Sequence, residues 1–176
     1  MKNKILIYSL VIFFFSSTYN IIFANEINFD TTDIKISNNG EIINAGKGIA
    51  KSIEDNIEID AERFKYFKNL LILEAYNGVA IATEEDIEIK ANEFRYNKNL
   101  SVINAIGNVE IRDLKKNFLV KSQNIFFYIK EKKIKSKTKS TVTDNLGNTV
   151  ITKNFIYTVN DDLIKMNDVK VIDIEK

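Results

Sequence analysis

Four alternating lysines are the side chains best spaced for polar chemistry: Lys133, Lys135, Lys137 and Lys139. Alternate side chains of a β-strand point to the same face, so a strand here would place the four ammonium groups in one row. Such a row suits contact with phosphate groups, toward which lysine acts as a point charge. The alternative is a solvated edge strand in which lysine prevents aggregation between strands.

Composition excludes most catalytic chemistry. The chain contains no His and no Cys, so it can form neither a Ser-His-Asp triad, nor a Cys nucleophile, nor a zinc or haem site built from these residues. The acidic clusters Glu84-Glu85-Asp86 and Asp161-Asp162 lie between apolar runs without EF-hand spacing. Solvated loops therefore explain them better than a Ca²⁺ site or an acid–base pair does. We expect no enzymatic activity, no cofactor and no metal site.

Eight apolar and aromatic residues alternate with charged ones and are the candidates for an inner face. They are Ile57, Ile59, Phe64, Tyr66, Ile87, Ile89, Phe94 and Tyr96. A period of two predicts strands with one buried and one solvated face. The apolar set changes from odd to even positions near Glu62-Arg63 and again near Asn92-Glu93, which predicts a β-bulge or a corner at each place. Ordinary packing between two closed sheets remains an equally good explanation of all eight.

The same pattern returns every thirty residues. Residues 44–73 align with residues 74–103 without a gap, a looser copy begins at Asn104, and a fourth covers 150–171. A fixed period of this size indicates supersecondary units stacked in a row. Turn signals such as Asn39-Gly40 and Gly147-Asn148 separate the apolar runs. We therefore predict an all-β antiparallel domain of about ten to thirteen short strands.

The N-terminus has the pattern of an export signal. Lys2 and Lys4 precede an apolar run from Ile5 to Phe15, and a small residue follows at Ala24. This pattern predicts a signal peptide over 1–24 and a mature domain over 25–176; an uncleaved anchor is the alternative. The formal net charge of +1 makes the chain a poor candidate for nucleic-acid binding.

The repeats resemble a known family. The segments "IEIDAERFKY" (57–66), "IEIKANEFRY" (87–96) and "NAIGNVEIRD" (104–113) are similar to the repeat of the OstA-like periplasmic lipopolysaccharide-transport proteins. These comprise a free-standing LptA-type bridge and the N-terminal domain of the LptD-type assembly protein. The resemblance covers residues 33–173. Two units depart from it, because Gly46-Lys47-Gly48 and Asn77-Gly78 replace the family's Gly-Asn pair.

The resemblance implies both a fold and a function. The fold would be a V-shaped β-jellyroll of two antiparallel sheets. The eight inner-face residues would bind lipopolysaccharide acyl chains, and the four lysines would contact the phosphates of the lipid A head group. Partners would be lipopolysaccharide and other Lpt-type jellyrolls, which would pair with edge strands near Ile27–Ile36 and Val169–Ile174, as would further copies in a head-to-tail homo-oligomer. The location would be the periplasm, with association at the outer membrane. The alternative is a structural or adhesive β-solenoid with a closed core and no lipid.

Overall fold

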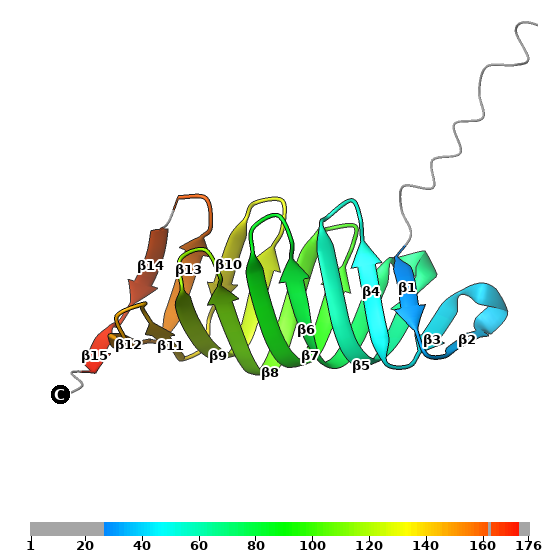
Figure 1. Ribbon diagram of the computed structural model, residues 1–176, viewed down its shortest axis with the longest axis horizontal. Coiled ribbons are helices and arrows are strands. Elements are labelled where there is room, and N and C mark those ends of the chain that lie inside the picture. The colour runs from blue at the N-terminus through cyan, green and yellow to red at the C-terminus, as the bar shows by residue number, and fades with distance from the viewer. Residues whose placement is uncertain (1–26, 162, 173–176) are drawn as a thin grey trace, which may run out of the picture.

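The computed structural model describes residues 27–161 and 163–172, and they form an all-β, antiparallel sheet (Figure 1). The first strands are β1 (Asn28–Thr31), β2 (Ile34–Ser37), β3 (Ile42–Ala45) and β4 (Gly48–Ser52). Five long strands follow: β5 (Ile57–Phe67), β6 (Ile72–Ala82), β7 (Ile87–Asn97), β8 (Val102–Asp113) and β9 (Phe118–Tyr128). The last are β10 (Lys133–Ser136), β11 (Ser140–Thr143), β12 (Thr149–Thr152), β13 (Asn154–Thr158), β14 (Leu163–Asn167) and β15 (Lys170–Ile172). Two short 3₁₀ helices, η1 (Asn38–Gly40) and η2 (Lys68–Leu70), lie in turns.

The fold class is confirmed, but the prediction of ten to thirteen short strands is wrong, because the central strands are eleven or twelve residues long.

The sheet is folded on itself into two layers. Asp55, in the turn before β5, accepts a hydrogen bond from Ser101, in the turn after β7. A straight strand of eleven residues would hold these two turns about 36 Å apart, so the long strands must bend near their middle. Layer A contains β1, β4, β11, β12, β15 and the half-strands 57–61, 78–82, 87–91, 109–113 and 118–122. Layer B contains β2, β3, β10, β13, β14 and the half-strands 63–67, 72–76, 93–97, 102–106 and 124–128.

The bend lies where the parity of the apolar residues changes, as the sequence predicted. Ala61 and Phe64 of β5 are both buried although their positions differ in parity, because Glu62 and Arg63 turn outward together at the bend. Small residues line its inside, so the two halves can approach closely. In β8 the bend takes one extra residue, and its register with β9 shifts between Ile106 and Val109.

Each thirty-residue unit consists of two eleven-residue strands and two four-residue turns. Strands β5 and β6 with the turns 53–56 and 68–71 make one unit, and β7 with the twelve-residue β8 makes the next. The extra residue falls at Gly107-Asn108, where both residues have positive φ. It breaks the period of thirty, which explains why the copy beginning at Asn104 aligns less well.

Gly78 tests how tightly the bend is packed. A Cβ added to Gly78 would lie 2.2 Å from the carbonyl oxygen of Asp60 and 2.8 Å from Cβ of Ala61. We expect Gly78→Ala to lower the free energy of unfolding by about 2–3 kcal/mol, since the backbone itself must move. Gly40→Ala is the control: its φ is +93° with nothing within 4 Å, so we expect a loss of about 1 kcal/mol. If urea denaturation showed equal decreases in the free energy of unfolding for Gly78→Ala and Gly40→Ala, the bend would not be tightly packed at Gly78.

The sheet ends in unpaired edges at both ends of the long axis (Figure 1). Among the described residues, β1 and β2 lie at one end, and β14 and β15 lie at the other. Strands β1, β2 and β15 lie in or overlap the two predicted edge segments, whereas β14 lies outside both. Asp173 and Ile174 lie outside the described residues, as do the predicted signal peptide and the mature N-terminus at Asn25. No helix in the described part of the chain is long and apolar enough to cross a membrane.

Candidate functional site

The eight predicted inner-face residues all point between the two layers. Ile57, Ile59, Ile87 and Ile89 belong to layer A, and Phe64, Tyr66, Phe94 and Tyr96 belong to layer B. Their exposed fractions are between 0% and 3%. They form part of one buried apolar cluster that continues along the strands of both layers. The structure therefore brings all eight together, in surroundings from which water is excluded.

Side chains of different size occupy different parts of this interior. Small residues line the bend, in a register of Gly48, Ala61, Gly78 and Ala91. Aromatic rings lie near the free margin of layer B, at Tyr66, Tyr96, Phe127 and Tyr157. Sequence reasoning did not select Phe127 or Tyr157 as site residues. The aromatic-x-aromatic pattern of Phe155 and Tyr157 was the signal that could have selected Tyr157.

The turns form two rows at the free margins of the layers, which we call the lips. Lip A consists of the turns 53–56, 83–86 and 114–117, and lip B consists of the turns 68–71, 98–101 and 129–132. Backbone hydrogen bonds join neighbouring turns within a lip, for example from Thr83 N to Asn56 O at 3.0 Å and from Lys98 N to Leu71 O at 2.9 Å. Each lip is therefore a continuous backbone ladder.

A buried carboxylate joins the lips at the first crossing. The hydroxyl of Tyr96 donates to Asp55 Oδ2, and Ser101 Oγ donates to Asp55 Oδ1 at 2.9 Å. The Tyr96 hydroxyl also lies 3.0 Å from Ser52 Oγ. Burial, reinforced by the hydrogen bond to Asp55, raises the pKa of Tyr96 well above its usual value. Beside them Lys98 Nζ contacts Glu54 Oε2 at 2.7 Å, and this hydrogen bond lowers the pKa of Glu54.

Two further crossings repeat along the lips. Lys132 Nζ of lip B lies 2.9 Å from Glu85 Oε1 of lip A, and the hydrogen bonds to Glu85 and Glu84 raise the pKa of Lys132. At the third crossing Lys116 Nζ donates to the Tyr157 hydroxyl at 2.7 Å and to the Val159 carbonyl at 2.6 Å.

The crossings use the same turn position with different chemistry. Asp55, Glu85 and Lys116 each occupy the third residue of a four-residue turn in lip A. Their partners on the side of layer B are the hydroxyls of Tyr96 and Ser101, the ammonium group of Lys132, and the Tyr157 hydroxyl with the Val159 carbonyl, respectively. These contacts hold the lips together. The inner-face side chains are therefore buried between the two layers in this structure.

The four lysines do not form one row on one strand, contrary to the expectation. Lys133 and Lys135 lie on the outer face of β10, which ends at Ser136. Lys137 and Lys139 are exposed in the connection that carries the chain from layer B to β11 in layer A. At the end of the strand, the Ser136 side chain bonds to the hydroxyls of Ser122 and Thr138. Contact of these lysines with phosphate remains a prediction.

Both acidic clusters lie in loops, but Glu85 is buried there, contrary to the expectation of solvation. Glu84 and Glu85 contact Lys132, and Asp86 contacts Lys115 at 3.2 Å, while Asp161 is exposed. Within residues 27–161 and 163–172, no group of three or more acidic side chains is placed to hold a metal ion.

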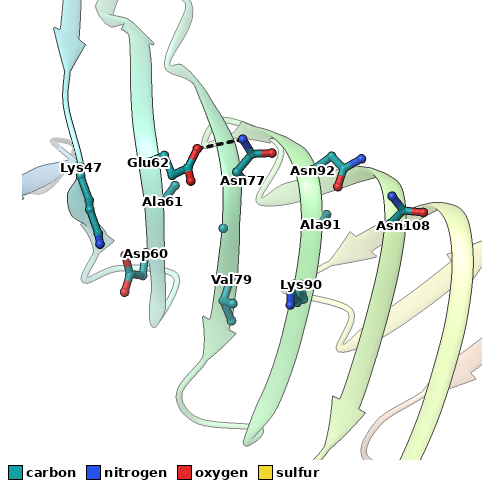
Figure 2. A pocket seen from close by; sticks show the side chains of 11 residues that line it. Lys47, Asp60, Ala61, Glu62, Asn77, Val79, Lys90, Ala91, Asn92 and Asn108 are labelled. Atoms are coloured by element: carbon teal, nitrogen blue, oxygen red, sulfur yellow. Dashed lines mark hydrogen bonds between the residues drawn. The ribbon is translucent and has the colours of Figure 1, made fainter.

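A shallow depression of about 470 Å³ lies on the outside of the bend (Figure 2). Its polar wall includes Lys47, Asp60, Lys90, Asn92 and Asn108. Figure 2 shows Asn77 donating to Glu62, a hydrogen bond of 2.9 Å between β6 and β5. These groups can bind water or a polar solute. The side chains at the bend also form hydrogen bonds between neighbouring strands, in addition to the backbone hydrogen bonds of the sheet.

Comparison with known proteins gives structural likenesses but no match in sequence. No family model matches the chain, and no curated protein matches its sequence. Among solved structures it matches LptH, the LptA-homologous periplasmic component of the lipopolysaccharide transport device of Pseudomonas aeruginosa. The match has 7% sequence identity and a TM-score of 0.36, and it covers 86% of this chain and 96% of that chain. Values this low assign neither a family nor a function.

Proposed function

We propose that this chain is a non-enzymatic periplasmic carrier that shields the acyl chains of lipopolysaccharide between its two β-layers. The observation that carries the proposal is the apolar inner face, which extends through both layers along the long axis and is interrupted by buried hydroxyls at Ser122, Ser136, Ser140 and Thr152. Removing acyl chains from water into such a face contributes about 0.8 kcal/mol per CH₂ group.

The buried charges lie near the ends of the strands, away from the middle of the apolar inner face, which supports this role. The buried charged residues Asp55, Glu85, Lys98 and Asp113 lie at or beside the turns that end the strands. The inner faces of the long strands β5, β6 and β7 are apolar from the lips to the bend. An acyl chain would enter where the lips part or through an open end of the sheet, and the unpaired edges would pair with neighbouring jellyrolls by strand addition.

A structural role is the second candidate, and the lip crossings favour it. Three sets of polar contacts close the interior, and the inner-face residues are already fully buried without a ligand. A closed solenoid needs no more than this for stability.

Site-specific photo-crosslinking in a lipopolysaccharide-producing host separates the two functions. We would place p-benzoylphenylalanine at Phe94, which is 0% exposed on the inner face, and at Ile81, which is 37% exposed on the outer face of layer A. We expect a lipopolysaccharide adduct from position 94 and none from position 81, because acyl chains are held between the layers.

The melting temperature of each labelled protein shows whether the fold survives the larger side chain. A folded protein without an adduct at position 94 would reject the carrier and leave the structural role. Equal adducts at both positions would mean that lipid adsorbs to the surface, which also contradicts the proposal.

A further inference from the structure

The outer face of layer B carries an apolar row next to lip B. The strand registers align six apolar residues across the layer: Ile42, Phe67, Ile72, Val102, Tyr128 and Leu163. Asn97, Lys133 and Thr158 occupy the same register on the intervening strands. All are half-buried or exposed, and Leu163 is 43% exposed. An apolar row on the solvent side of a sheet contributes nothing to the core. It extends for about 40 Å at the usual spacing of strands.

A basic row runs beside it on the same face, two residues closer to the bend along each strand. It contains Lys35, Lys65, Arg95, Lys135 and Lys165, with Glu74 as its one acidic residue. The two rows contact each other, since Lys65 Nζ lies 4.8 Å from the ring centroid of Phe67 and Lys135 Nζ lies 4.4 Å from that of Tyr128. Cations of one row thus lie over the rings of the other.

Layer A has no such surface at the corresponding positions. Its matching row contains three basic and three acidic residues: Lys90, Lys121, Lys170, Asp30, Asp60 and Glu110. Lys121 Nζ and Glu110 Oε1 form an ion pair at 3.3 Å. The charges on this face neutralise one another, so the positive excess belongs to layer B alone.

We propose that the outer face of layer B docks on an anionic lipid bilayer. The basic row would contact lipid phosphates, and the apolar row would lie at the boundary between head groups and acyl chains. Parallel apolar and basic stripes are the arrangement by which amphipathic surfaces bind in this plane. Tyrosine suits the boundary because one end of its ring is apolar and the other is polar. The proposal is independent of the lipid carrier function, because it uses the opposite face of the strands.

Vesicle co-sedimentation tests the docking. Protein beginning at Asn25, the predicted mature N-terminus, is mixed with phosphatidylcholine vesicles that contain or lack phosphatidylglycerol. We expect binding to the anionic vesicles only. Each Lys near an anionic surface contributes about fivefold in affinity, so we expect Lys65→Gln/Lys135→Gln to lower the partition coefficient by about 25-fold. Lys90→Gln/Lys121→Gln removes the same charge from layer A and is expected to change it by less than about twofold.

A third variant tests the apolar row. Raising the salt concentration screens the basic row, and we expect Phe67→Ser/Tyr128→Ser to remove the binding that remains. No binding of the unsubstituted protein to anionic vesicles would overturn the proposal and leave an acidic protein as the partner of this face. Equal losses in the two lysine variants would overturn it as well, since net charge alone would then explain binding.

Discussion

Asp55→Ala is expected to lower the free energy of unfolding by about 3 kcal/mol. The carboxylate accepts hydrogen bonds from Tyr96 and Ser101 across the lips and is 6% exposed. Removing it leaves two buried hydroxyls short of an acceptor, each at a cost of about 1–3 kcal/mol, of which Ser52 recovers part for Tyr96. Urea denaturation of the purified domain measures the change.

Asp60→Ala is the matched control for this prediction. Asp60 is an exposed residue of the same type on the outer face of β5, and we expect its removal to change stability by less than about 0.5 kcal/mol. Similar losses from the two substitutions would contradict the idea that the lip crossing is a main contributor to stability. The urea m-value should be unchanged in both variants if the denatured state is the same.

Alkaline pH is expected to unfold the protein, with Tyr96 as one identified cause. Its folded pKa is raised above the ordinary value of 10.0, mainly by burial, so the folded protein keeps a proton that the unfolded chain loses. Below pH 10 the protonated Tyr96 makes its full contribution to the free energy of unfolding. This contribution declines as the pH rises from 10 toward the pKa of Tyr96 in the folded protein. The expected slope is about 1.4 kcal/mol per pH unit above pH 10.

Tyr96→Phe isolates this contribution. The variant shares every other titratable group with the unsubstituted protein, so the difference in slope between them belongs to Tyr96. We expect the variant to be less stable at neutral pH, where it lacks the hydroxyl that bonds Asp55, but to lose stability less steeply above pH 10. Identical slopes in urea denaturation from pH 8 to pH 11 would reject the assignment.

The fold could be predicted from local alternation because the strands are half-buried. The parity change at Glu62-Arg63 located the bend to within a residue, since both halves of β5 must present their apolar side chains to one interior. Strand length could not be predicted, because an Asn-Gly or Gly-Asn pair suits either a turn between strands or a bulge inside one. Asn77-Gly78 and Gly107-Asn108 occupy the bends of β6 and β8 and do not form hairpin turns.

The inner face could also be predicted, but its closure could not. Ile59 and Phe94 are buried as the alternation indicated. The lip crossings join residues about forty positions apart, such as Asp55 and Tyr96, and no local pattern marks such pairs. The charges that close the lips, Glu85 among them, were interpreted as loop solvation for that reason. The outer rows of layer B were missed because they become rows only when the register of all the strands is known.

The thirty-residue unit also determines how the protein can change in length. One unit adds a strand from lip A to lip B and a strand back, so inserting or deleting a whole unit leaves both edges and both lips with their original identity. The molecule would lengthen or shorten by about 10 Å, twice the spacing of neighbouring strands. A gain of half a unit would instead exchange the lips beyond that point, and the side chains of the lip crossings would lose their present partners. The length of the molecule can therefore change only by whole units of two strands.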